Sequence, residues 1–320
     1  MAHLPAPSRS STCTILKEAI SLFAKNPRVL SSLFLISLFA GYLLFSAMKF
    51  STFSLHADVA RISAALATTD HRSPAYSELL AALLRDTREL LSVELAYLVV
   101  GSAITYTLTA VNICALAAAQ AGGKQQETLR EVLRDAKPSL AGALLTQLLV
   151  AVLTFGYIFV VAMAVMTIYY LSDRSVWWLA LAAALGVAAA AWWMYLMAIF
   201  SLSVVVSVVE QGTRGWKAIS RAAELIKGSK WQGVGIVVVL FVVGVAVTLP
   251  LTAVTRRLHL GLWGQLCVGL GSVAVTKVAS FVEWGAFVVL HSGCKRRHGE
   301  EAAVAGKLGY VSVPTADVES

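Results

Sequence analysis

The chain has 320 residues, of which 58% are hydrophobic and only 14% are charged, and its formal net charge is +8. Soluble domains carry about 25% charged residues, so this composition excludes an ordinary soluble protein. The apolar runs exceed about 18 residues, whereas a membrane β-barrel would show alternating segments of ~10 residues. The composition therefore predicts an all-α, polytopic transmembrane helix bundle. Nucleic acid is not expected as a partner, because the basic residues gather at the ends of the predicted spans.

The N-terminal region is expected to hold a tail and a surface helix. Residues 1–12 are rich in proline and serine, which predicts a disordered tail. Residues 13–25 place apolar side chains at helical spacing with charged ones opposite, which predicts an amphipathic helix on the membrane surface. Asn26 and Pro27 are expected to end this helix.

Six helical spans are predicted, because a bilayer core of about 30 Å requires about 20 helical residues. They cover about 29–48, 95–117, 140–171, 176–208, 234–254 and 263–290. Together they make a single transmembrane domain over 13–298, which a cytosolic tail over 299–320 follows. Asp173 and Arg174 are the only charged residues between positions 140 and 209, so they mark the turn of the central hairpin.

Several segments between the spans are also expected to be helical. On the far side, the loop over 50–89 holds predicted helices at 57–66 and 74–91. On the cytosolic side, a short amphipathic helix precedes the third span and another precedes the fifth. Pro138 is expected to break the chain after the first of these helices, and Gly228 after the second.

The distribution of basic residues predicts the orientation. About two thirds of the Lys and Arg residues lie in segments on the same side as the N-terminus, and this excess marks the cytosolic side. Both termini are therefore expected in the cytosol. The basic segments there are expected to face anionic headgroups of the bilayer.

Each cytosolic helix is followed by a breaker and then by two spans, which gives three similar units. One interpretation is a fold built by triplicating a single unit. The other is that any chain entering a membrane from the cytosol tends to carry basic interfacial helices there. Residue identities between the units are weak, so the sequence leaves both interpretations open.

Two stretches near the cytosolic side carry a family resemblance. The first comprises VSVVE at 206–210, Gly215, Ala218 and ELIKG at 224–228, and the second comprises Cys294, Lys295, His298 and Glu300. In these residues and in its layout, the chain resembles a plant family of six-span integral membrane proteins of uncharacterised function. Some members are labelled as binding partners of poly(A)-binding protein.

The resemblance implies a location and little chemistry. It implies a plant endomembrane or plasma-membrane protein, with no enzyme activity or substrate to carry over. Ala222 stands where the family usually has a serine, and the acidic pattern after Glu300 also departs from the family. The chain is therefore identified as a divergent member.

Sequence motifs indicate no enzyme. The chain contains no HExxH, GxxxxGKS/T or GxSxG pattern. Its four cysteines, Cys13, Cys114, Cys267 and Cys294, form no CxxC pair, which argues against a zinc site or a disulfide framework. We therefore expect no enzymatic activity, no cofactor and no metal.

Three polar residues within spans form a candidate intramembrane cluster: Asn112, Lys277 and Glu283. A charge at mid-bilayer costs at least about 2.5 kcal/mol, so it must face a partner or water. We expect the second and sixth spans to be neighbours, with Asn112 bonded to Glu283 and Lys277 reaching another acceptor in the bundle. These residues either hold helices together or line an ion path.

The predicted cytosolic helix before the fifth span is a second candidate site. It carries Trp216, Lys217, Arg221 and Lys227. Its apolar face and positive charge predict that it lies on anionic lipid, and a protein partner is the alternative.

Two functions remain as hypotheses. The leading one is a multi-pass membrane protein without enzymatic activity, a scaffold or trafficking component of plant endomembranes, because no site is evident and the resemblance points there. The alternative is a small-molecule transporter or channel that uses the polar residues within its spans. Either protein would lie in the endomembrane system or the plasma membrane.

Overall fold

The computed structural model describes residues 11–121, 129–171, 176–210, 212–257 and 261–297. Within these ranges all regular structure is helical and no strand occurs, which confirms the predicted all-α class. The helices are α1 (Thr12–Lys25), α2 (Pro27–Thr68), α3 (Pro74–Gln120), α4 (Leu129–Leu171), α5 (Val176–Val209), α6 (Trp216–Ile226), α7 (Lys230–Arg257) and α8 (Leu262–Arg297). The turn at Asp173 and Arg174 and nearly all of the two predicted tails lie outside the described residues.

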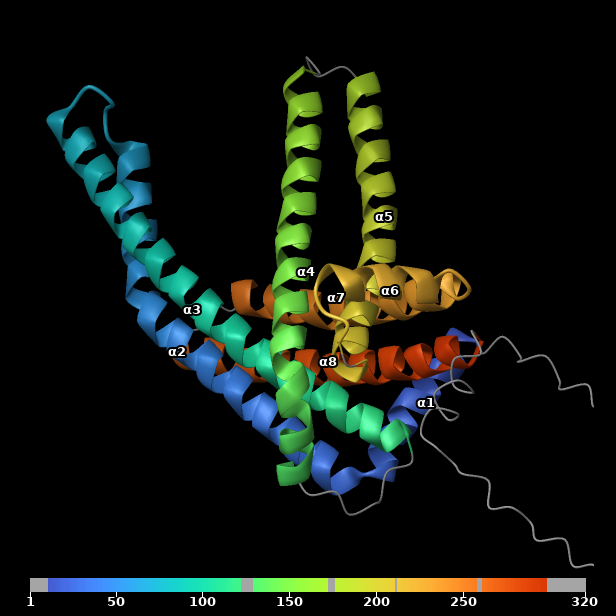
Figure 1. Cartoon of the computed structure of the whole chain (residues 1–320). Coiled ribbons are helices and arrows are strands. Elements are labelled where there is room, and N and C mark those ends of the chain that lie inside the picture. The colour runs from blue at the N-terminus through green and yellow to red at the C-terminus, as the bar shows by residue number, and fades with distance from the viewer. Residues whose placement is uncertain (1–10, 122–128, 172–175, 211, 258–260, 298–320) are drawn as a thin grey trace, which may run out of the picture.

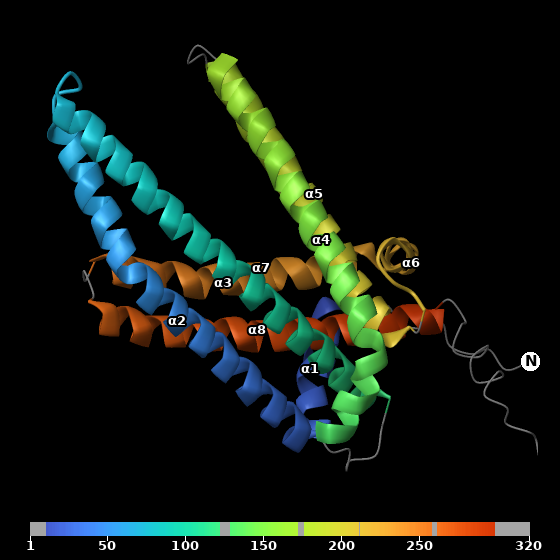
Figure 2. The ribbon, with the colours of Figure 1, turned by 60° about the vertical axis from the view of Figure 1, so that its left-hand side comes forward.

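The long helices pair into three antiparallel hairpins, α2 with α3, α4 with α5, and α7 with α8 (Figure 1). The hairpins fan out from a shared base, where the short helices α1 and α6 also lie (Figure 2). Six helices are long and apolar enough to cross a membrane, and they correspond to the six predicted spans. The described chain begins and ends at the base, because α1 packs against α8.

Local sequence signals end several helices where they were expected to end. α1 ends at Lys25 and α2 begins at Pro27, which occupies the first helical turn, where a missing N–H is tolerated. α6 ends at Ile226 and α7 begins at Lys230. The predicted breaks at Pro27 and Gly228 are therefore confirmed.

The prediction of a break at Pro138 is wrong, because this residue lies inside the continuous helix α4. Proline removes one backbone hydrogen bond and costs a helix interior about 3 kcal/mol. Packing fixes the chain on both sides of it, since Ala136 and Ala143 are fully buried. These tertiary contacts hold the two sides in one helix despite the proline.

Helices α2 and α3 are much longer than the predicted spans 29–48 and 95–117. The helices predicted at 57–66 and 74–91 are confirmed, but they continue those spans instead of standing apart. With 42 and 47 residues, α2 and α3 measure about 63 and 70 Å, roughly twice the thickness of a bilayer core. Residues 49–56 contain no glycine or proline, so nothing in the sequence interrupts the helix there.

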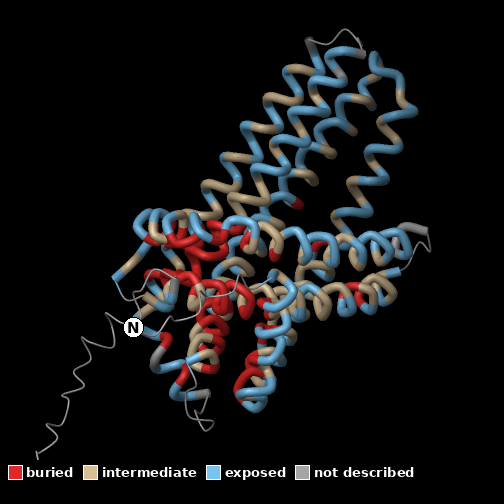
Figure 3. The backbone as a smooth tube through the Cα atoms, turned by 90° about the vertical axis from the view of Figure 1, so that its right-hand side faces the viewer, coloured by how far each residue is buried: buried red, intermediate tan, exposed pale blue. Residues whose placement is uncertain are grey.

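The buried core lies at the base of the molecule, as Figure 3 shows. It includes large, fully buried side chains from six helices, namely Leu22, Leu30, Leu116, Leu202, Leu225 and Phe287. The outer parts of the hairpins instead expose apolar side chains, and Phe159 and Val160 are each 65% exposed. Apolar surface of this extent is suited to contact with lipid, because it would be unfavourable in water.

Helices α2 and α8 approach closely where one of them lacks a side chain. A Cβ added at Gly269 of α8 would overlap the ring of Phe45 in α2, so the contact requires glycine at this position. Along α5, in contrast, nothing lies within 4 Å of a Cβ added at Gly186.

Candidate functional site

A cavity of about 390 Å³, here called the central cavity, lies between helices α2, α3, α4, α5 and α8. Each of these helices contributes polar side chains to a lining that is otherwise apolar. They include Ser37, Asn112, Gln147, Ser201, Lys277 and Glu283. The fold thus brings together all three polar residues of the predicted intramembrane cluster.

Asn112 binds a different partner from the one predicted. Its side chain is 5% exposed, and its amide nitrogen donates to the hydroxyl of Ser37 over 3.4 Å. Its amide oxygen is buried without a hydrogen-bond partner. Helices α3 and α8 are neighbours, as predicted, but the bond to Glu283 is not formed because Asn112 turns toward α2, which runs alongside α3.

Glu283 instead accepts a hydrogen bond from a residue of α5. The hydroxyl of Ser201 donates to its carboxylate over 3.1 Å. Helix α5 packs against α8 at the base, which places this hydroxyl beside the acid. The sequence did not single out Ser201, because a serine in an apolar helix is common and carries no signal of its own.

Gln147 is a second buried amide in the lining, contributed by α4. It is 5% exposed, and its amide oxygen has no hydrogen-bond partner among the described residues. Gln147 was not predicted, although an amide within the apolar third span is the same signal that identified Asn112. Asn112 and Gln147, which both line the central cavity, therefore each carry a fully buried amide oxygen without a hydrogen-bond partner among the described residues.

Lys277 lies on α8 between the central cavity and α2. Its side-chain carbon Cε lies 3.0 Å from the position that a Cβ of Gly41 would occupy, so the absence of a side chain there makes room for the lysine. Within the part of the chain that the structure describes, no acidic group lies at ion-pair distance from its ammonium group. The prediction that Lys277 reaches an acceptor in the bundle is thus not met by an acidic side chain.

The chemistry of the central cavity is that of a binding site. Among the described residues, its lining contains one acidic residue, one basic residue, two amides and several serine and threonine hydroxyls, while aromatic and aliphatic side chains make up the rest. Among the described residues, no group of three or more His, Cys, Asp or Glu side chains is placed to hold a metal ion. Such a mostly apolar pocket with a few polar groups is typical of sites that bind small molecules.

A second polar group, here called the Glu210 cluster, lies at the base. Glu210 directly follows α5, and its side chain is 14% exposed. Its carboxylate accepts a hydrogen bond from Nε2 of His291 over 3.2 Å and lies 3.6 Å from the ammonium group of Lys295. On its other oxygen, Nε of Arg221 lies 3.7 Å away. The cluster therefore ties the end of α5 to both α6 and α8.

The surroundings of Glu210 favour its charged form. The hydrogen bond from His291 and the charges of Lys295 and Arg221 hold the pKa of Glu210 below its ordinary value, although burial alone would raise it. A charged carboxylate with several cationic neighbours is a stable ionic tie between helices.

A family model described as a domain of unknown function, DUF8558, matches residues 10–306. The chain belongs to the DUF8558 family. No curated protein and no solved structure matches it significantly. Both the central cavity and the Glu210 cluster lie within the part of the chain that the DUF8558 model covers.

In this DUF8558 chain, the stretches that carry the plant-family resemblance meet at the base. Glu210 of the first stretch contacts Lys295 of the second. Gly215, also in the first stretch, adopts a positive φ of 56°, and its N–H donates to Thr146 of α4 over 2.9 Å. Ala218 is fully buried. His298 and Glu300 lie outside the described residues.

The predicted lipid-facing helix of the DUF8558 chain corresponds to α6, and its apolar face is occupied. Its small and aliphatic residues Ala218, Ala222, Leu225 and Ile226 are fully buried and pack mainly against α5. Trp216, Lys217 and Lys227 are exposed, whereas Arg221 turns to Glu210 and Glu224. The protein itself thus covers that face, and contact of the exposed Trp216, Lys217 and Lys227 with anionic lipid stays a prediction.

Proposed function

We propose that this chain is a multi-pass integral membrane protein that binds a small polar solute in the central cavity and carries it across the membrane. The observation that carries the proposal is the central cavity of about 390 Å³, into which five membrane-length helices bring acidic, basic, amide and hydroxyl side chains. This observation favours the transporter hypothesis over the scaffold hypothesis, which the sequence alone placed first.

Energetics distinguish a binding site from residues that only hold helices together. Polar groups with a purely structural role bond to one another, as Glu210 and His291 do at the base. Lys277 and Glu283 of the central cavity instead have no ionic partner among the described residues, and an occupant that carries opposite charges would lower the cost of keeping these charges away from water. A cavity of about 390 Å³ exceeds the volume of a single water molecule, about 30 Å³, so it has room for a small solute.

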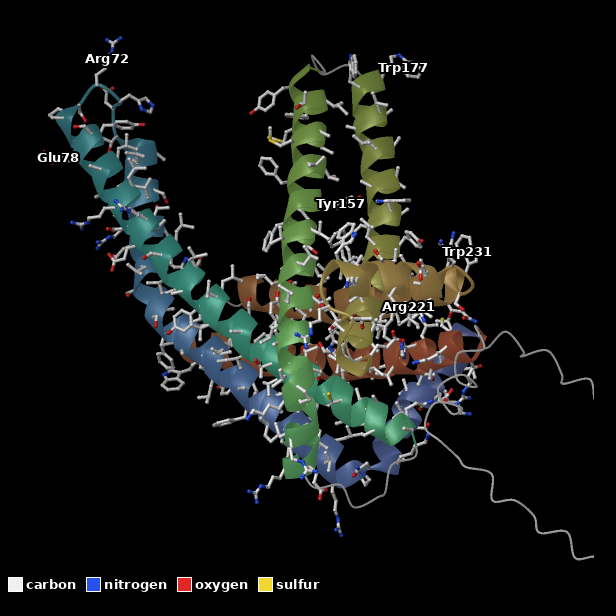
Figure 4. All side chains as sticks on the ribbon, in the orientation of Figure 1. Arg72, Glu78, Tyr157, Trp177, Arg221 and Trp231 are labelled. Carbon is white, nitrogen blue, oxygen red and sulfur yellow. The ribbon has the colours of Figure 1, made fainter. Side chains whose placement is uncertain are left out.

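The arrangement of the hairpins supports the proposed topology. Figure 4 shows Arg72, Glu78 and Trp177 near the hairpin tips, and Arg221 and Trp231 at the base. The exposed Trp177 and Trp231 suit the two interfaces of a membrane. We place the base and both termini on the cytosolic side. The family resemblance supports a plant endomembrane or plasma membrane.

Flux measurements test the transport proposal. The purified chain is reconstituted in liposomes and offered radiolabelled amino acids, polyols and nucleosides. At least one should enter in a saturable manner, and Gln147→Leu should reduce this uptake at least tenfold. Thr167→Val is the matched control, because Thr167 is exposed on the same helix outside the cavity. Background uptake of every probe, or normal uptake by Gln147→Leu, would contradict the proposal.

A scaffold or trafficking component without enzymatic activity is the second candidate function. The α2–α3 hairpin favours it, because helices longer than a bilayer offer surface outside the membrane to a protein partner. Proximity labelling from a C-terminal tag tests it. A scaffold should label a reproducible set of proteins that is lost when the hairpin tip is replaced by a short turn. If the same proteins are labelled after the tip has been replaced, this candidate function is rejected.

A further inference from the structure

We infer that the central cavity selects small zwitterionic solutes, with an ammonium group toward Glu283 and an anionic group toward Lys277. This inference rests on the proposed function, and it adds the chemical class of the solute. Its basis is the pattern of charge and hydrogen-bonding capacity that the lining leaves uncompensated.

The lining carries two opposite charges that lack ionic partners. Among the described residues of the lining, Glu283 is the only acidic one and Lys277 the only basic one. The one bond to Glu283 comes from the hydroxyl of Ser201, and no ion pair involves either charged residue within the described ranges. Isolated charges are costly away from water. A solute with a single charge compensates one residue and is repelled by the other, whereas a zwitterion compensates both.

The two charged residues do not pair with each other along α8. They are six positions apart, so their backbones are separated by about 9 Å along the axis and by about 120° around it. Residues pair on a helix at spacings of three or four. A solute lying between α8 and the opposite helices can bridge the two charges.

The hydrogen-bonding capacity of the lining matches an ammonium group. The carboxylate of Glu283 provides two acceptor oxygens, and the serine and threonine hydroxyls of the lining provide further acceptors. An ammonium group has three donors and no acceptor. A neutral polyol could bond to the hydroxyls but would leave both charges uncompensated.

Binding of a matched series of probes tests the inference. The full chain in lipid nanodiscs is titrated calorimetrically with 4-aminobutyrate, butylamine, butyrate and 1,4-butanediol, which share a four-carbon chain and differ in charge. Glycine and 6-aminohexanoate extend the zwitterion series to shorter and longer molecules. The best zwitterion should bind at least tenfold more tightly than each of the singly charged or neutral probes.

Charge removal should then change selectivity in opposite ways. Lys277→Met should abolish the preference for 4-aminobutyrate over butylamine, because it removes the charge that faces the carboxylate. Glu283→Gln should abolish the preference for 4-aminobutyrate over butyrate, because it removes the charge that faces the ammonium group. Lys49→Met is the control, because Lys49 lies on α2 outside the cavity lining, beside the ring of Phe45. The comparison of probes on the unmodified chain needs no variant, so it stands even if a variant does not fold.

The outcomes separate the two proposals. If a singly charged or neutral solute binds at least as tightly as every zwitterion, the inference is wrong and the proposed function stands. If zwitterions bind best but neither variant changes the preference, the assignment of Lys277 and Glu283 is wrong. If no probe binds and no solute of the flux panel enters liposomes, the proposed function is rejected together with the inference.

Discussion

Replacing Glu210 by glutamine tests whether the Glu210 cluster holds the base together. The substitution keeps the size of the side chain and an acceptor for His291, but it removes the negative charge that faces Lys295 and Arg221. The carboxylate is 14% exposed, His291 is 6% exposed, and the other two partners are between 25% and 28% exposed. Breaking a fully buried ion pair costs about 3–5 kcal/mol and an exposed one about 0–1 kcal/mol.

The cluster lies between these limits, so we expect Glu210→Gln to reduce the free energy of unfolding by about 2–3 kcal/mol. In a chain of this size that loss lowers the melting temperature by roughly 3–5 °C. Differential scanning fluorimetry of the purified protein in detergent at neutral pH measures the shift. Glu224→Gln is the matched control, since Glu224 also pairs with Arg221 but is 62% exposed, and it should cost less than about 1 kcal/mol. Equal melting of Glu210→Gln and wild type would refute the reasoning.

The same variant has a predicted pH dependence. The pKa of Glu210 is lower in the folded chain than its ordinary value of 4.5, so the carboxylate stabilises the fold fully above that value. As the pH falls through the lower, folded pKa, the carboxylate becomes protonated and its contribution is lost. The difference in melting temperature between wild type and Glu210→Gln should therefore be constant near neutrality and should shrink below pH 4.5. A difference that grows in acid would contradict this assignment.

Three further substitutions test packing within and between hairpins. Gly269→Ala should lower the free energy of unfolding by about 1–3 kcal/mol, because the added methyl group meets the ring of Phe45, whereas Gly186→Ala should be neutral or stabilising by up to about 1 kcal/mol. Tyr157→Phe should cost about 0.5–1.5 kcal/mol, since it removes a 2.6 Å hydrogen bond to the backbone carbonyl of Ala189. Melting temperatures check all three. Destabilisation by Gly186→Ala equal to that by Gly269→Ala, or an unchanged Tyr157→Phe, would contradict the described packing.

Helix existence could be predicted from the sequence, because apolar runs of bilayer length are an unambiguous signal. Helix ends were predictable where one local residue decides them, as at Pro27 and Gly228. Pro138 could not be placed by the same rule, because the packing of its neighbours outweighs its local cost. The lengths of α2 and α3 were underestimated, because a predicted span ends where the hydropathy of the sequence falls. The helices themselves continue beyond that point.

The members of the site were partly predictable, but their partners were not. Asn112, Lys277 and Glu283 stand out in apolar runs, and all three line one cavity. The bonds they form depend on how each helix is rotated about its axis, and periodicity within a nearly uniform apolar helix does not fix that rotation. The Glu210 cluster was hidden for another reason, because Glu210 and Lys295 are distant in sequence and meet only at the base.

The location of the core at the base has a consequence for biosynthesis. Helices α1 and α8 contribute to the same buried cluster, through Ile15, Ala19 and Leu22 of α1 and through Phe287 and Leu290 of α8. The first and the last described helices therefore form this part of the core together. Contacts of such large sequence separation form late, since a ribosome supplies the chain from its N-terminus. The three hairpins can therefore insert into a membrane one after another. Helix α1 gains its packing partner only after α8 has been synthesised. A chain truncated within α8 should lack the α1–α8 contact. The apolar and charged side chains that this contact covers would then be exposed to the quality-control machinery of the cell.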